Sequence, residues 1–286
     1  MRYENTIAAV LWAAVFCTGN IGAQAFEDSK YPNLKGQWVR AVAPGTVDEP
    51  RFDPSKPPGR GQEPPLTPEY RAIFEANLRE RDAGVPGTWP GPTCLPPGMP
   101  AQMTAYRPLE FIVLPNITYI RIDYVRETRR RIYTDGRDWP KQVEEGFDGY
   151  SIGQWIDQDN DGRYDVLEVE TRHFKGPRNF DLSGIPLHED NATVIKERIF
   201  LDKADQNLLH NEMTVFDHAL TRPWTVMKDY RRSADPKPQW EEYMCVWESN
   251  TIRIGDETYL LDKDGFIRPA KNDQPPPSLK YFPAQR

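Results

Sequence analysis

Three neighbouring stretches of the sequence, TVIKERIFL (193–201), LLHNEMTVFDH (208–218) and PWTVMKDYRR (223–232), decide the class of fold. In the first stretch, every second residue from Ile195 to Leu201 is apolar except a single glutamate. This period of two is the pattern of a β-strand, in which successive side chains point to opposite faces. Short strands that follow one another with turns between them predict an antiparallel sheet that closes into a barrel or packs as a sandwich.

The strand pattern extends in both directions along the chain. LEFIVL (109–114) and ITYIRIDYV (117–125) are separated by Pro115-Asn116, which is a turn signal, so they predict a β-hairpin. Further strands are predicted in RRRIYT (129–134), YSIGQWI (150–156), VLEVETR (166–172) and the segments around Thr251–Ile254 and Thr258–Leu261. The fold class we predict is mainly β, with an antiparallel barrel or a strongly curved sheet.

The chain before this β region alternates between irregular and regular segments. One short strand is expected within YPNLKGQWVR (31–40), whereas EPRFDPSKPPGRGQEPPL (49–66) contains too much Pro and Gly for regular structure. A helix should begin after the N-cap Thr67, carry an apolar stripe of Tyr70, Ile73, Phe74 and Leu78, and end at Gly84. We therefore predict an N-terminal segment at 26–108, a β domain at 109–271 and an extended tail at 272–286.

The first 25 residues predict a secretory signal peptide. Arg2 gives a basic start, residues 6–17 are apolar, and Ala23 and Ala25 form a small-residue cleavage site. We expect an exported protein, periplasmic or secreted, with no membrane span, because no later segment is apolar over the roughly 20 residues that a spanning helix needs. The net charge of −7 argues against nucleic acid as a partner.

Two cysteines, Cys94 and Cys245, follow the predicted cleavage site. An even pair in an oxidising compartment predicts a disulfide, and two separate thiols are the alternative. The bridge would connect the Pro-rich segment to the C-terminal strands.

The stretch WIDQDNDGRYDVLEVE (155–170) matches the spacing D-x-D-x-D-G-x₅-E of a calcium-binding loop. Strands are expected on both sides of it, so the acidic run should connect a β-hairpin rather than two helices. We predict a structural calcium site with carboxylate ligands from Asp157, Asp159, Asp161 and Asp165 and the backbone carbonyl of Arg163. Gly162 would permit the sharp turn, and Glu168 should belong to the following strand. A solvated acidic turn is the alternative.

Four strings occur in the order RRIYTDGRDWP (130–140), GYSIGQW (149–155), LHEDNATVIKERIFLDKAD (187–205) and DHALTRPWTV (217–226). Together they resemble a large, mostly uncharacterised family of exported proteins from environmental bacteria, over roughly residues 90–285. The more widespread form of that family has a histidine where this chain has Tyr150, so a catalytic role of that histidine would not carry over to this chain. GQW (36–38) also looks like the G-x-W that opens lipocalin-type barrels, which favours a lipocalin-like barrel with one enclosed cavity.

Candidate catalytic residues are few, and each has a structural alternative. Glu197 lies on the apolar face of its predicted strand, where it could act as a general base or form an ion pair with Arg131 or Arg222. Asp217 and His218 suggest an acid–base pair, but neighbours on a strand point to opposite faces. His188 lies beside acidic residues in a segment expected to be an exposed loop.

These patterns leave two functions open. The first is a calcium-stabilised protein that binds a small apolar or aromatic compound, and the second is an enzyme without a redox cofactor, such as a hydrolase, lyase or isomerase, acting on such a compound. The cavity is expected to be lined by Trp155, Ile199, Met213 and Trp224. The sequence does not identify the ligand or the oligomeric state.

Overall fold

The computed structural model describes residues 27–41, 53, 55–56, 60–83, 95–104, 107–124, 126–240, 251–254, 257–261 and 267–268. The predicted signal peptide, both cysteines of the predicted disulfide and the predicted C-terminal tail lie outside the described residues. Among the helices that the structure describes, none has both the length and the apolar character needed to cross a membrane.

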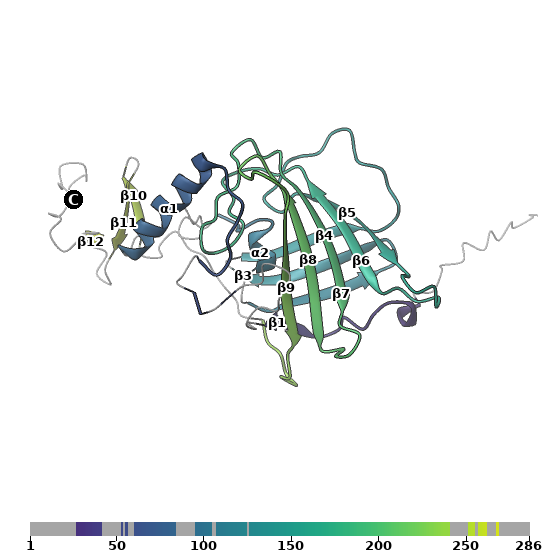
Figure 1. The fold of residues 1–286 in the computed structure, drawn as a ribbon. Helices are drawn as coiled ribbons and strands as arrows, with labels where there is room; N and C mark the ends of the chain where they lie inside the picture. Colours follow the sequence, from purple (N-terminus) through teal and green to yellow (C-terminus); the bar gives the residue numbers. More distant parts are fainter. Residues whose placement is uncertain are drawn as a thin grey trace, which may run out of the picture.

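Nine strands form a closed barrel (Figure 1), which confirms the predicted mainly β fold. The strands are β1 (Gln37–Arg40), β2 (Leu109–Leu114), β3 (Ile117–Tyr124), β4 (Arg126–Tyr133), β5 (Tyr150–Ile156), β6 (Val166–Arg172), β7 (Val194–Leu201), β8 (Leu208–Phe216) and β9 (Trp224–Arg232). Neighbours in the barrel are neighbours in sequence, and β9 pairs with β1 to close it. Three further strands, β10 (Thr251–Ile254), β11 (Glu257–Leu261) and β12 (Ile267–Arg268), form a separate sheet rather than continuing the barrel.

One pair of neighbouring strands is parallel, unlike the fully antiparallel sheet that we predicted. β4 and β5 pair in parallel through Ile132 with Ser151 and Tyr133 with Ile152. A ring in which every neighbouring pair is antiparallel requires an even number of strands, so a nine-stranded barrel needs at least one parallel pair. The connection 134–149 therefore has to carry the chain back along the barrel before β5 can begin.

The strand β1 belongs to the barrel, although the sequence placed it in a separate N-terminal segment. Trp38, in the GQW motif, is fully buried, and its indole N–H donates to the carbonyl of Leu34 at 2.9 Å. The guanidinium of Arg232, at the end of β9, lies 4.3 Å from the centre of the same ring. Trp38 thus contacts both its own chain segment and β9, the strand that pairs with β1 to close the barrel.

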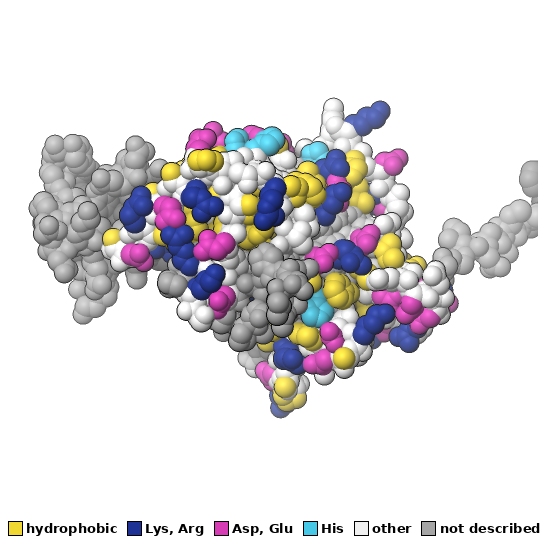
Figure 2. Space-filling model, in the orientation of Figure 1, with side chains coloured by type: hydrophobic (Ala, Val, Ile, Leu, Met, Phe, Trp, Pro, Cys, Tyr) yellow, Lys and Arg dark blue, Asp and Glu magenta, His cyan; other side chains and the backbone are white. Residues whose placement is uncertain are grey.

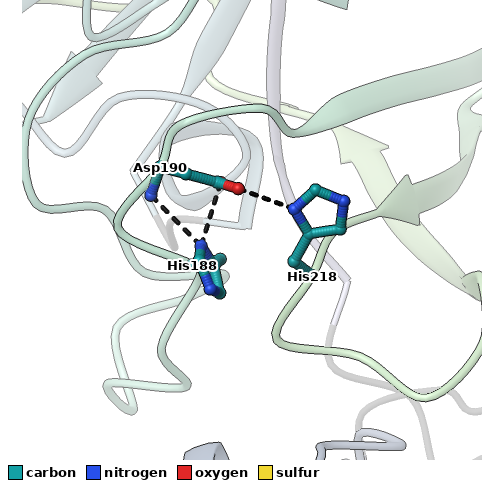
Figure 3. Close-up of side chains that lie close together, drawn as sticks. All are labelled: His188, Asp190 and His218. Carbon is teal, nitrogen blue, oxygen red and sulfur yellow. Dashed lines mark hydrogen bonds and ion pairs between the residues drawn. The ribbon is translucent and has the colours of Figure 1, made fainter.

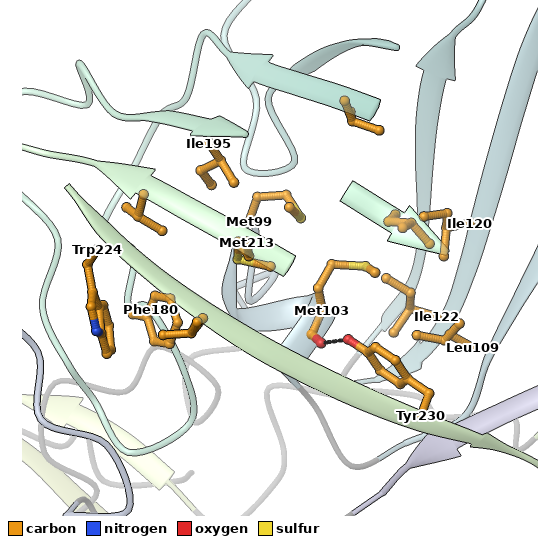
Figure 4. Packing of buried hydrophobic residues seen from close by; sticks show 14 of the residues in the cluster. Met99, Met103, Leu109, Ile120, Ile122, Phe180, Ile195, Met213, Trp224 and Tyr230 are labelled. Atoms are coloured by element: carbon orange, nitrogen blue, oxygen red, sulfur yellow. Dashed lines mark hydrogen bonds between the residues drawn. The ribbon is translucent and has the colours of Figure 1, made fainter. Parts of the chain in front are cut away.

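The predicted helix is confirmed as α1 (Pro68–Asp82), capped by the Thr67 hydroxyl, with Tyr70, Phe74 and Leu78 buried. Ile73, which we also placed on the apolar stripe, is exposed instead. A second helix, α2 (Ala101–Thr104), was not predicted, because it follows a Pro-rich stretch and is only four residues long. Its carbonyl at Met103 accepts a hydrogen bond from the hydroxyl of Tyr230 on β9. This contact fixes α2 against the interior side of the barrel wall (Figure 4).

Buried side chains form one core cluster around the positions where we predicted an internal cavity. Met99 and Met103, both fully buried, lie among Met213, Ile120 and the other core residues labelled in Figure 4. Three of the predicted cavity residues, Ile199, Met213 and Trp224, belong to this packed cluster, and the Trp224 ring lies 4.4 Å from that of Phe180. Methionine is flexible enough to fill irregular gaps, so Met99 and Met103 from the segment around α2 add to a core that the strand pattern alone did not predict.

Charged side chains of both signs are interspersed over the face of the molecule seen in Figure 2. The strands contribute to this mixture through cross-strand pairs such as Lys196 with Glu170, 3.6 Å apart. Oppositely charged neighbours of this kind offset one another, so the outer face of these strands carries a mixed charge.

Candidate functional site

Glu197 points into the barrel, as the alternation in β7 predicted, but its ion-pair partner is Arg130 rather than Arg131 or Arg222. Arg130 donates from Nη1 to Oε1 of Glu197 at 2.9 Å and forms a second contact through Nη2. Asn211 donates to the same carboxylate at 2.9 Å. The side chains of Arg130 and Glu197 are 1% and 0% exposed. A carboxylate held by three hydrogen bonds in a fully buried ion pair is a structural group, because a substrate in solvent does not reach it.

Asp217 and His218 lie in a turn, since β8 ends at Phe216 and not at His218 as we expected. Asp217 accepts hydrogen bonds from the backbone N–H groups of His188 and Ala219, at 2.9 and 2.8 Å, and from the hydroxyl of Thr193. His218 instead contacts Asp190. Asp217 and His218 have different partners and do not form an acid–base pair. The separation arises because they lie in a turn, and not because neighbours on a strand point to opposite faces.

His188, Asp190 and His218 form a cluster that the sequence did not reveal (Figure 3). The Nδ1 atoms of His188 and His218 lie 3.0 and 2.6 Å from the two carboxylate oxygens of Asp190. Burial raises the pKa of Asp190, but hydrogen bonds from His218, the Ala192 N–H and His188 outweigh it and lower the pKa to about 2. The hydrogen bond to Asp190 raises the pKa of His218. Each histidine therefore lies against an ionised carboxylate.

Several contacts hold the loop that carries His188 and Asp190. The rings of Tyr70 and His188 are 5.2 Å apart, and the hydroxyl of Tyr70 accepts a hydrogen bond from the Glu189 N–H at 3.4 Å. Asn191 adopts a left-handed backbone conformation with φ of 56°, which asparagine tolerates better than most residues and which closes the turn. The loop is thus tied to α1 on one side and to Asp217 on the other.

The acidic run forms the β5–β6 hairpin loop that we predicted. Carboxylate oxygens of Asp157, Asp159 and Asp165 lie within 4.8 Å of one another, so three of the four predicted carboxylate ligands converge. The fourth, Asp161, does not belong to this group, and its carboxylate accepts a hydrogen bond from the Arg163 N–H at 2.8 Å. Gly162 has φ of 88°, as expected of a sharp turn.

Glu168 belongs to β6, as predicted, and lies apart from the loop cluster. Its carboxylate is 3.4 Å from the guanidinium of Arg198 on β7 and also accepts a hydrogen bond from Gln154. The hairpin therefore offers its ligands from the loop alone. The role of the Arg163 carbonyl remains a prediction.

A groove of about 770 Å³ runs along the outer face of β5–β8. The aromatic residues that line the groove are Tyr31, Trp139, Trp155, Tyr164 and Phe216. Outward polar residues of the strands, such as Gln154, Lys196 and Glu212, form the rest of its surface. The Tyr31 ring lies 5.3 Å from Trp155 and 5.1 Å from Tyr164. Trp155 is the one predicted cavity residue that borders the groove, and it also packs against the core, since its cross-strand partner is the buried Leu167. Glu197 reaches the groove through its backbone only, since its side chain is 0% exposed.

No protein-family model, curated protein or solved structure matches this chain. The family resemblance and the lipocalin-like motif therefore remain predictions, and the functional argument depends on the geometry of the described residues.

Proposed function

We propose that the protein binds a small aromatic compound in the groove outside β5–β8 and that a calcium ion in the acidic hairpin stabilises the groove wall. The observation that carries the proposal is the aromatic lining of a hollow of about 770 Å³, which falls in the size range of small-molecule sites. Tyr31, Trp155 and Tyr164 present ring faces and edges within 6.3 Å of one another, an arrangement suited to contact with another ring.

The hairpin and the groove share a segment of chain. Tyr164 lines the groove, and its neighbour Asp165 is one of the three converging carboxylates. The Tyr164 N–H also donates to the carbonyl of Lys30 at 2.7 Å, which attaches the hairpin to the segment that carries Tyr31. A calcium ion bound by oxygen ligands would neutralise the repulsion among the carboxylates and fix this end of the groove. Export, which the signal sequence predicts, suits the weak calcium sites typical of extracellular proteins.

Binding is supported better than catalysis at this groove. The carboxylates that line it, including Glu168 and Glu170, form cross-strand ion pairs with Arg198 and Lys196 at 3.4 and 3.6 Å. A general base needs a free acceptor at the reacting atom, and these carboxylates already have cationic partners. A cofactor-independent enzyme remains the alternative function.

The experiment uses the fluorescent aromatic probe 8-anilinonaphthalene-1-sulfonate with the full chain, followed by displacement with benzoate, phenol and indole. We expect saturable binding that is weakened at least about fivefold by Trp155→Ala, since ring contacts supply about 1 kcal/mol or more each. Ile112→Ala is the matched control, because Ile112 is an exposed apolar residue on β2 and does not line the groove.

Equal affinity of both variants for the probe would contradict the proposed site. Turnover of any displacing compound by the wild type would favour the enzyme instead. Thermal melts of each variant separate lost binding from lost folding.

A further inference from the structure

We propose that His188, Asp190 and His218 form a binding site for a zinc ion, separate from the acidic hairpin. The cluster combines two imidazoles and one carboxylate, which are the donor types that zinc takes in sites with three protein ligands. Calcium and magnesium prefer oxygen ligands alone, so the nitrogen donors favour a transition metal here.

The distances suit a small tetrahedral ion. One donor atom from each residue lies within 4.8 Å of the other two. Tetrahedral zinc with bonds of about 2.0–2.1 Å places its ligand atoms about 3.3 Å apart. The separations of 3.0 and 2.6 Å between Asp190 and the two Nδ1 atoms are close to this value. His218, whose side chain is 70% exposed, has room to move the remaining fraction of an ångström.

His188 Nδ1 already faces the Asp190 carboxylate. This nitrogen lies 3.0 Å from an oxygen of the carboxylate and 3.2 Å from the backbone N–H of Asp190 (Figure 3). A ring nitrogen carries either a proton or a lone pair, so in the metal-free protein it binds the carboxylate through its proton. A zinc ion would replace that proton, and the nitrogen and the carboxylate oxygen would then both become ligands.

The surroundings hold the donors in place before any ion arrives. Asp217 accepts the N–H of His188 at 2.9 Å, and Asp190 accepts the N–H of Ala192 at 3.0 Å. Asp217 also precedes His218 in the chain, so one carboxylate links the two loops that supply the ligands. Contacts that orient the ligands from outside the coordination sphere are typical of metal sites.

Three protein donors leave the fourth tetrahedral position for water. The exposure of His218 makes this position accessible from solvent, which is the arrangement of zinc sites that bind exogenous ligands rather than of closed structural sites.

The test is calorimetric titration of the full chain, after treatment with a chelator and dialysis, with zinc chloride. We expect one equivalent to bind, and the affinity to fall at least about tenfold in His218→Ala and in Asp190→Asn, because each change removes a ligand. The protein has four histidines, and His173→Asn is the matched control because His173 lies outside the cluster. Asp159→Asn in the hairpin is the control for zinc held by the acidic loop.

Cobalt(II) provides a second readout, since tetrahedral cobalt absorbs strongly in the visible range. The wild type and both control variants should develop this absorption, and His218→Ala should not. The proposal is wrong if the wild type shows no saturable zinc binding or if His218→Ala and Asp190→Asn bind as tightly as the wild type. It is equally wrong if only Asp159→Asn loses the ion, which would assign the metal to the hairpin.

Discussion

The acidic hairpin and the His188–Asp190–His218 cluster gather metal-ligand side chains in opposite ways. The hairpin takes Asp157, Asp159 and Asp165 from one continuous loop between two paired strands. The cluster brings His218 against a loop almost thirty residues earlier in the chain, and it depends on Asp217 and Tyr70 to hold that loop. A continuous site is visible as a spacing in the sequence, whereas an assembled site exists only because the barrel brings its loops together.

The largest effect should come from breaking the assembled region at Asp217. Asp217→Ala removes the acceptor for two backbone N–H groups and one hydroxyl, and we expect a loss of about 3 kcal/mol in the free energy of unfolding. Urea denaturation measures it. Asp159→Ala in the hairpin is the control and, with a chelator present in both samples, should change stability by less than about 0.5 kcal/mol. Comparable losses in the two variants would remove the distinction between the regions.

The next largest effect should come from calcium binding to the acidic hairpin. An ion present at 100 times its dissociation constant stabilises the native state by about 2.7 kcal/mol, which should raise the melting temperature by about 5–10 °C. Asp159→Asn should abolish this shift, whereas Asp161→Asn should keep most of it, because Asp161 is not among the converging carboxylates and instead accepts the Arg163 N–H. Melting curves with calcium and with a chelator decide the matter. Identical curves for the wild type would exclude the hairpin site.

The smallest effect concerns Asp148, a residue whose chemistry depends on the fold around it. Burial raises the pKa of Asp148 from 3.8 to about 6, although Arg130 lowers it in part. The native state therefore favours the protonated carboxyl, and the stability that this group contributes below pH 3.8 is lost as pH rises to about 6. Asp148→Asn should be more stable than the wild type by roughly 2 kcal/mol at pH 7.5 and equal to it near pH 3.5. A difference independent of pH, measured by urea denaturation, would contradict the raised pKa.

The sequence predicted features that a local pattern encodes. Alternation along β7 placed Glu197 inside the barrel, the Thr67-Pro68 pair located the start of α1, and the spacing of aspartates located the hairpin loop. Each of these features depends on residues that lie close together in the sequence, within one strand, one helix start or one loop.

Features that depend on distant residues were missed or misassigned. The partner of Glu197 depends on which strand lies across the barrel. Arg130 differs from its neighbour Arg131 only in which face of β4 it occupies. Met99 and Met103 join the core from a Pro-rich segment with no regular period, so their place in the core had no signal in the sequence. The parallel pairing of β4 with β5 follows from the strand count of the whole ring.

The closure of the barrel by β1 also has a consequence for how the protein folds and where it aggregates. This four-residue strand is supplied by the N-terminal segment and pairs with both β2 and β9. Contacts between such distant parts of a chain form slowly, because a large loop must close first, so the seam should be among the last parts to form. Until it does, β2 and β9 are open edges that can pair with another molecule, and aggregation during refolding should start there.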